Sequence, residues 1–212
     1  MLRQEGIFGC GTNLQERLIP GFPELEKLVD FLKKYLKYRV VLTQGKYNQQ
    51  HYGHQRYVQR AREFGDFLIV GVDSDEKIRA KKGPDYPLIP QMERIEGLAH
   101  TRHVDALFLK EKDHEHWALI KAVRPDVLVV SESTKAGGET PLPPYSPEEM
   151  EQLKEFCGRI EILPPQATES TSARWRNFQI DMAEKIGNDV LEALSTDIPA
   201  LVRAAIGKYT RR

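Results

Sequence analysis

The sequence predicts an α/β protein with a doubly wound parallel sheet of five strands, an N-terminal helix before it and a C-terminal helical extension after it. Two observations lead to this fold class. Five short runs rich in β-branched and apolar residues alternate with segments whose apolar residues recur at helical spacing. The first strand, helix and strand follow one another within about 35 residues, as in a right-handed βαβ unit.

The first part of the chain divides into an arm and a helix. Residues 1–22 contain glycine, proline and polar residues without clear periodicity, so we expect an irregular arm. From Pro23 to Leu36 apolar residues recur every three or four positions, which predicts an amphipathic helix. Its acidic residues stand early and its lysines late, in agreement with the helix dipole. We therefore expect an arm and helix at 1–38, the α/β domain at 39–180 and a C-terminal extension at 181–212.

The elements of the α/β domain follow in regular alternation. Strands are expected at residues 39–43, 66–72, 103–109, 126–130 and 159–163. Helices are expected at residues 55–64, 91–101, 116–123, 147–157, 172–194 and 198–209. Two segments punctuated by proline and glycine, 73–90 and 131–147, are expected to be loops. In such a sheet ligands bind beyond the carboxyl ends of the strands, so we look for the site there.

Composition excludes several classes of function. Lysine plus arginine and aspartate plus glutamate number 31 each, so no net positive field favours nucleic acid. The two cysteines, Cys10 and Cys157, lie far apart and form no metal-binding pair. No run approaches the roughly 18 apolar residues of a membrane span. These features predict a cytoplasmic protein with no membrane segment and no nucleic acid partner.

The stretch from Gly45 to His54, GKYNQQHYGH, joins the first predicted strand to the helix after it. A strand, a glycine-containing turn and a helix start bring backbone N–H groups and the positive end of a helix dipole to one point, where anions bind. His51 and His54 are three residues apart, so one helical turn places them on the same face. The stretch predicts a phosphate site, although two histidines on a turn are, taken alone, more often plain surface residues.

Further motifs in order give this stretch a family context. The stretch is similar to the signature G-x-F-D-x-x-H-x-G-H. Other matches follow at Gly65–Asp75, Lys82–Gly83, Pro87, Arg94, Val104–Asp105, Pro125–Val129 and Ser170–Ser172. A lone HxGH is a weak signal, whereas several motifs in order over about 135 residues make a strong one. From Val40 to Arg176 the chain resembles the HxGH (HIGH-type, cytidylyltransferase-like) nucleotidyltransferase superfamily, and most of all the adenylyltransferase domain of ADP-heptose synthase.

The resemblance implies a Rossmann-like fold and a reaction. A phosphorylated acceptor attacks the α-phosphate of a nucleoside triphosphate and pyrophosphate leaves, and catalysis comes mainly from alignment and charge stabilisation. The expected reaction transfers AMP from ATP to a sugar phosphate or a similar phosphorylated small molecule. The implied catalytic residues are His51, His54, Lys46 and Lys82. The implied nucleotide-binding residues are Gly45, Tyr47, Gly53, Arg94, Ser170, Thr171 and Ser172.

The resemblance also implies a metal ion and an assembly. Mg²⁺ is expected with the triphosphate, bound chiefly through substrate oxygens and water, and no dedicated protein metal site is expected. The histidines at 100, 103, 114 and 116 fit no standard zinc spacing. A homodimer is expected because dimers are common in this group, and the C-terminal helices offer apolar faces for it.

Departures from the family pattern leave the substrate open. Asn48 stands where the family usually has aspartate, and Val130–Lys135 replaces a segment that helps to form the nucleotide pocket. The second segment is faintly similar to that of pantetheine-phosphate adenylyltransferases. The alternatives are a cytidylyltransferase, an enzyme like pantetheine-phosphate adenylyltransferase, or a noncatalytic nucleotide-binding protein of the same fold.

Individual residues have simpler alternatives too. Lys82 could belong to a solvated basic loop, and Arg94 could pair with Glu93 or Asp105 on a helix surface. Hydroxyl residues at 170–172 would cap a helix with or without a nucleotide. A nucleic acid module would rest only on the basic clusters at 79–82 and 208–212.

Overall fold

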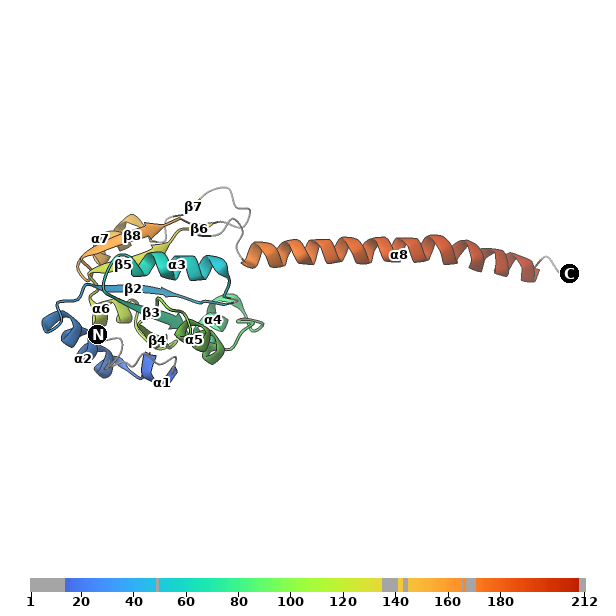
Figure 1. Cartoon of the computed structure of the whole chain (residues 1–212). Helices are drawn as coiled ribbons and strands as arrows, with labels where there is room; N and C mark the ends of the chain where they lie inside the picture. Colours follow the sequence, from blue (N-terminus) through green and yellow to red (C-terminus); the bar gives the residue numbers. More distant parts are fainter. Residues whose placement is uncertain are drawn as a thin grey trace. The chain divides into compact units, whose positions relative to one another are not determined.

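The structure, a computed structural model, describes residues 14–48, 50–134, 141–142, 145–164, 166 and 171–209. It divides into two compact units, Met1–Thr168 and Glu169–Arg212. The first unit contains the sheet and the helices that pack on it, and the second contains the long helix α8 (Figure 1).

The first unit is built on a six-stranded sheet in which every neighbouring pair is parallel. In sheet order the strands are β1 (Leu18–Ile19), β4 (Ala106–Lys110), β3 (Phe67–Asp73), β2 (Val40–Gly45), β5 (Val127–Ser131) and β8 (Arg159–Leu163). The predicted fold class is confirmed, but the count of five strands is wrong. The additional strand β1 lies in the predicted irregular arm, where two residues are too few to show a strand periodicity.

Helices cover both faces of the sheet. Those of the first unit are α1 (Leu14–Arg17), α2 (Phe22–Lys34), α3 (Tyr52–Arg62), α4 (Asp75–Lys82), α5 (Gln91–Ala99), α6 (Ala118–Val123) and α7 (Pro147–Leu153). A short antiparallel pair, β6 (Ser133–Thr134) and β7 (Pro141–Leu142), lies within the second predicted loop. Helices α3, α5, α6 and α7 confirm the helices expected at 55–64, 91–101, 116–123 and 147–157, although their ends differ from the expected ones.

The core consists of two apolar clusters, one on each face of the sheet. Residues of α2, α6 and α7 pack on one face, and residues of α3 and α5 pack on the other. Alternate residues of a strand point to opposite faces, so Leu42 of β2 joins the first cluster and Val41 joins the second. Both are fully buried, as expected of the central strand of a parallel sheet. Strand β2 is thereby fixed from both sides.

Helix α4 overturns the prediction of a loop over the whole of residues 73–90. Ser74 begins the helix, and its hydroxyl accepts a hydrogen bond from the backbone N–H of Lys77 at 3.2 Å. Gly83 ends it with φ of 100°, a value that glycine adopts far more readily than other residues. Ile78 is the buried residue of this helix. One buried side chain gives too weak a periodicity to predict a helix.

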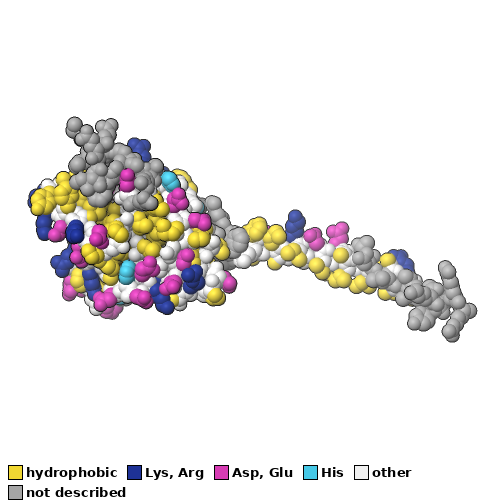
Figure 2. All heavy atoms as spheres, turned by 90° about the horizontal axis from the view of Figure 1, so that it is seen from below, with side chains coloured by type: hydrophobic (Ala, Val, Ile, Leu, Met, Phe, Trp, Pro, Cys, Tyr) yellow, Lys and Arg dark blue, Asp and Glu magenta, His cyan; other side chains and the backbone are white. Residues whose placement is uncertain are grey.

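The second unit is helix α8 (Thr171–Tyr209), a single helix where the sequence predicts two. The helix continues through Pro199, although an internal proline removes one backbone hydrogen bond and costs about 3 kcal/mol. Alanine and leucine on both sides of this residue favour the helical conformation. Apolar side chains are exposed along the helix (Figure 2). Among the described residues, no helix is both long enough and apolar enough to cross a membrane.

Candidate functional site

The candidate site lies at the carboxyl end of β2. Strands β3 and β4 follow β2 on one side and β5 and β8 lie on its other side, so the strand order reverses between β2 and β5. Ligands of open α/β sheets bind at such a switch point. Gly45 is the last residue of β2, and a Cβ atom there would lie 3.2 Å from the Tyr47 ring. The absence of a side chain at Gly45 therefore leaves room for the Tyr47 ring to pack closely against the backbone.

Helix α3 begins inside the histidine motif. His51 is its N-cap and Tyr52 is its first residue, so the helix begins three residues before the predicted start at residue 55. The His51 Nδ1 atom accepts a hydrogen bond from the Gly53 N–H at 3.0 Å. The His51 carbonyl oxygen accepts from the N–H groups of His54 (2.9 Å) and Gln55 (3.2 Å). Because these N–H groups already have protein acceptors, an anion at this point would have to be bound mainly by side chains of the motif.

His51 and His54 stack against each other at the start of α3. Their ring centroids are 4.3 Å apart, which confirms that the motif brings the two imidazoles together. Since Nδ1 of His51 is an acceptor, the proton of the neutral ring lies on Nε2, which is then a donor. Burial, and to a lesser degree His51, lowers the pKa of His54 to about 4. His54 is therefore neutral at pH 7 and can act as a hydrogen-bond donor without a positive charge.

A buried tyrosine fixes α3 on the sheet. The Tyr57 hydroxyl donates a hydrogen bond to the carbonyl oxygen of Val129 in β5 at 3.0 Å. The Thr43 hydroxyl of β2 lies 2.7 Å from the Tyr57 hydroxyl oxygen and donates a hydrogen bond to it. Burial raises the pKa of Tyr57, so the hydroxyl keeps its proton. These bonds hold the histidine helix against the two strands that flank the switch point.

Lys46 and Lys82 come close together although they are far apart in sequence. Lys46 follows β2 directly and is half-buried, and Lys82 is the last residue of α4. The pKa of Lys46 is lowered, first by burial and then by the ammonium group of Lys82, while Asp73 opposes this shift. Two of the residues that were expected to be catalytic therefore share one positively charged region.

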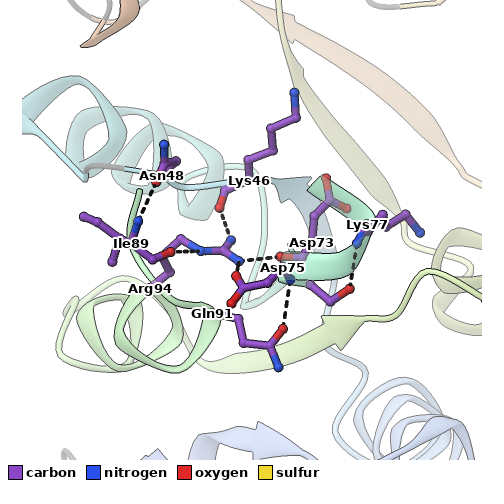
Figure 3. A network of polar contacts seen from close by, with 9 residues as sticks. Lys46, Asn48, Asp73, Asp75, Lys77, Ile89, Gln91 and Arg94 are labelled. Atoms are coloured by element: carbon purple, nitrogen blue, oxygen red, sulfur yellow. Dashed lines mark hydrogen bonds and ion pairs between the residues drawn. The ribbon is translucent and has the colours of Figure 1, made fainter. Parts of the chain in front are cut away.

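Arg94 ties together the segments that surround this region. Its guanidinium group is almost fully buried, with 1% of the residue exposed. Nε donates to the carbonyl oxygen of Ile89 (3.0 Å), Nη1 donates to that of Lys46, and Nη2 donates to that of Asp73 (2.8 Å) (Figure 3). Nη2 also pairs with the Asp75 carboxylate at 2.8 Å. The carboxylate partner of Arg94 is thus Asp75 of α4, whereas Asp105 pairs with Arg62.

The geometry of Arg94 favours a positioning role. Its hydrogen bonds reach the end of β2, the end of β3, the first turn of α4 and the segment before α5. The side chain of Lys46 points away from the guanidinium group (Figure 3). Direct contact between Arg94 and a nucleotide stays a prediction. Gln91 supports the same arrangement, because its Oε1 atom accepts from the Asp75 N–H at 2.9 Å.

Asn48 keeps a structural hydrogen bond at the position where the family usually has aspartate. Its Oδ1 atom accepts from the backbone N–H of Ile89 at 3.2 Å (Figure 3). An amide oxygen accepts such a bond as a carboxylate would, but without the negative charge. The substitution therefore preserves the link between the histidine turn and the segment before α5, while it removes a charge beside the site.

The remaining predicted site residues differ in what the structure describes of them. The Tyr47 ring is 4% exposed and lies 5.7 Å from the His54 ring, so it packs beneath the motif. Ser170 lies outside the described residues. Thr171 and Ser172 are described only as the first residues of α8, without their side chains. The nucleotide-binding role of these residues stays a prediction.

Two charged residues near the site are absent from the sequence-based predictions. Asp73 ends β3 and Lys110 ends β4, and their side chains form an ion pair of 3.1 Å. In the sequence, both residues can be recognised as the charged residue directly after a buried apolar run. They were missed because the predicted strands stopped one residue too early, at residues 72 and 109.

Comparison with known proteins agrees with this geometry. The cytidylyltransferase-like family model matches residues 42–168, which include the histidine motif and all strands from β3 to β8. The chain belongs to the cytidylyltransferase-like family. The membership predicted from the ordered motifs is confirmed, and with it the class of fold.

Relatives of this cytidylyltransferase-like chain include much longer proteins. Bifunctional protein HldE of Nitratiruptor sp. is 43% identical over 114 residues, which are 54% of this chain and 24% of that protein. Bifunctional protein HldE of Desulfatibacillum aliphaticivorans is 33% identical over 165 residues, 76% of this chain and 30% of that protein. The chain therefore spans about a quarter to a third of the length of these relatives.

A solved structure shares the cytidylyltransferase-like fold. Pantoate-beta-alanine ligase from Francisella tularensis superposes with a TM-score of 0.53 at 14% sequence identity. The match covers 80% of this chain and 77% of that one. At this identity the likeness concerns the fold alone.

Proposed function

We propose that this protein is a nucleotidyltransferase that transfers AMP from ATP to a phosphorylated small molecule, and that the acceptor is a sugar phosphate. The observation that carries the proposal is the pair of stacked imidazoles at the start of α3, the helix that follows β2 at the switch point of a cytidylyltransferase-like sheet. Lys46, directly after β2, and Lys82 add positive charge to this region. The ordered motifs that resemble ADP-heptose synthase and the relatives named bifunctional protein HldE support the choice of acceptor.

The residues of the site have distinct parts in the proposed reaction. An oxygen of the acceptor phosphate attacks the α-phosphorus of ATP, a P–O bond forms, the bond to the β-phosphate breaks, and pyrophosphate leaves. Charge on the transferring group is stabilised by donors that are already in place. His51 and a neutral His54 would donate hydrogen bonds to it, and Lys46 and Lys82 would pair with the phosphates. Arg94 would hold α4 and the end of β2 in register.

Mg²⁺ is part of this proposal as a companion of ATP. Within the described ranges no group of three histidine, cysteine, aspartate or glutamate residues could hold a metal ion. Two carboxylates at the site are engaged, since Asp73 pairs with Lys110 and Asp75 pairs with Arg94. This arrangement agrees with an ion that binds together with the triphosphate and is held by phosphate oxygens and water. Bound in this way, Mg²⁺ neutralises charge on the leaving pyrophosphate.

The test is an assay of pyrophosphate release by the full chain. ATP or CTP is supplied with Mg²⁺ and a panel of sugar phosphates, and turnover is compared for wild type, His51→Ala and His54→Ala. We expect turnover with ATP and an aldose phosphate, and a loss of at least 10²-fold in kcat for each variant, because each removes a donor to the transition state. His100→Ala, an exposed histidine on another helix end, is the control and should retain wild-type kcat.

The outcomes separate the alternatives. Preference for CTP would favour a cytidylyltransferase, and turnover with phosphopantetheine alone would favour the pantetheine-phosphate type. Tight ATP binding without turnover across the panel would favour a noncatalytic nucleotide-binding protein. If the two histidine variants retained full turnover, the assignment of His51 and His54 as catalytic residues would be abandoned.

A further inference from the structure

The Asp73–Lys110 ion pair lies at the carboxyl edge of the sheet, beside the proposed reaction site. Asp73 and Lys110 are direct partners in the register of β3 and β4. The Lys110 Nζ atom lies 3.1 Å from Asp73 Oδ1, and the two side chains are only 16% and 13% exposed. Desolvation of two charges offsets much of their attraction, so stability alone does not explain an ion pair that is this well buried.

The backbone on both sides of the pair is fixed. The Asp73 carbonyl oxygen accepts from Arg94 Nη2 at 2.8 Å, and the Lys110 carbonyl oxygen accepts from the Ser74 N–H at 3.0 Å. Asp73 therefore holds its carboxylate at a defined place, and the Lys110 ammonium group is oriented by it. An ammonium group held in this way is preorganised, so a ligand that binds it does not have to order the lysine side chain.

Positive charge accumulates around this pair although the whole chain is neutral. Besides Asp73, the ammonium groups of Lys77 and Lys81 act on Lys110, and those of Lys81 and Lys82 act on Lys46. The pKa of Lys110 is lowered, mainly by burial. The neighbouring carboxylate of Asp75 is engaged by Arg94. Lys46 and Lys110 thus both interact with Asp73, and Lys77, Lys81 and Lys82 add positive charge around them, an arrangement that an anionic ligand would complete.

The Lys110 ammonium group has donors to spare. A lysine carries three N–H donors. Among the residues that the structure describes, the Lys110 side chain forms one ion pair, with Asp73. A phosphate oxygen could therefore be bound without breaking the ion pair.

We propose that Lys110, held by Asp73, is a specificity-determining residue that binds the phosphate group of the acceptor. This inference rests on the proposed function, since it names a residue of the same site. Lys110 extends the site from β2 across β3 to β4, away from the switch point between β2 and β5. Neighbouring strands lie about 4.8 Å apart, so the ends of β2 and β4 are separated by roughly 10 Å. With the nucleotide at the switch point, as proposed, a residue at this separation faces the acceptor.

The experiment measures the binding of two classes of probe, a nucleotide analogue and phosphate-bearing acceptors, separately on the full chain. Calorimetric titrations use α,β-methylene-ATP first, and then inorganic phosphate and aldose 1-phosphates in its presence. Lys110→Met is compared with Lys110→Arg and with Lys112→Met, which removes an exposed lysine two residues along the same segment. We expect Lys110→Met to weaken aldose 1-phosphate binding about tenfold or more, as loss of a charge-assisted hydrogen bond does. Binding of α,β-methylene-ATP should change less than twofold, and Lys110→Arg and Lys112→Met should bind both probes as wild type does.

Asp73→Asn separates ligand binding from a purely structural ion pair. Asparagine keeps an oxygen acceptor that can orient Lys110 but removes the negative charge that repels a phosphate. If Lys110 binds the phosphate, aldose 1-phosphate binding in Asp73→Asn is therefore equal to or tighter than that of wild type. If the pair is only structural, Asp73→Asn and Lys110→Met weaken both probes alike, and that result overturns the proposal. Failure of the wild-type chain to bind any aldose 1-phosphate or inorganic phosphate overturns it as well. Binding that depends on Lys110 without any pyrophosphate release supports this inference and counts against the proposed function.

Discussion

At the scale of single residues, His54 makes stability depend on pH. Its folded pKa of about 4 lies below the ordinary value of 6.5, because the neutral ring is buried beside His51. Between these values the unfolded chain binds more protons than the folded chain. The stabilisation by the neutral ring is therefore complete above about pH 6.5 and is lost as the pH falls toward 4.

This argument gives a direct prediction for His54→Gln. The free energy of unfolding should fall less between pH 7 and pH 5 in this variant than in wild type, because glutamine does not titrate. Urea unfolding at the two pH values measures the difference, and His100→Gln is the control with an exposed histidine. An equal fall in wild type and His54→Gln would show that His54 is not buried in its neutral form.

Residue-scale prediction from sequence succeeds where a motif fixes local geometry. The spacing of His51 and His54 is enough to place both rings at one helix start, and the stacking follows. It fails where the partner comes from elsewhere in the chain. Nothing in the sequence around Lys110 indicates that the register of β3 and β4 sets it opposite Asp73. The burial of Arg94 against four acceptors depends in the same way on segments far apart in sequence.

At the scale of elements, α4 is positioned from outside. Its own sequence supplies a cap at Ser74 and one buried side chain, Ile78, which is little packing for a helix of two turns. Its start is held by α5, since Arg94 pairs with Asp75 and Gln91 accepts from the Asp75 N–H. The lysines of α4 consequently reach the site in an orientation that depends on α5.

Replacing Arg94 should therefore affect both stability and the site. We expect Arg94→Met to lower the free energy of unfolding by about 3–5 kcal/mol, because removal of one partner leaves Asp75 and three backbone carbonyls without their donor. Arg94→Lys should recover only part of this, because an ammonium group cannot reproduce the fork of donors. Urea unfolding gives the energies, and amide exchange should show faster exchange in α4.

The control for Arg94 is an exposed arginine. Arg60 pairs with Glu63 at 2.7 Å on the surface of α3, with about half of each side chain exposed. Arg60→Met should cost less than about 1 kcal/mol. A loss of that size for Arg94→Met too would mean that the buried network does not hold α4.

A helix or strand can be predicted from sequence when it buries an apolar face, because that burial is what produces the periodic pattern. The central strands and α2, α3 and α5 show clear periodicity because they bury apolar faces on the sheet. The edge strand β1 and helix α4 bury little, and neither is recognised by its pattern. The predicted break between residues 194 and 198 is absent, and α8 also continues through Pro199, because local helix propensity on both sides outweighs one lost hydrogen bond.

At the scale of the whole molecule, α8 has more apolar surface than a solvated helix needs. An apolar residue stands at every fourth position from Phe178 to Ile206, and these eight side chains are 42–56% exposed. Figure 2 shows hydrophobic side chains along the described part of this helix. A row of side chains four apart forms a ridge that fits the groove of another helix. A contiguous apolar surface of this kind marks an interaction site. The expectation of a homodimer, made from the sequence, therefore has a definite surface to test.

We expect the full chain to self-associate through this row, and Leu194→Glu to weaken the association at least tenfold. A buried leucine contributes about 1.5–3 kcal/mol, and a symmetric pair would lose it twice, in addition to the cost of burying a carboxylate. Asn188→Glu adds the same charge to a polar position of the same helix, so its self-association should match that of wild type. Sedimentation equilibrium over a range of concentrations gives the dissociation constants. A wild-type chain that stays monomeric throughout, or two variants that associate equally, would show that α8 does not serve as the contact between two copies.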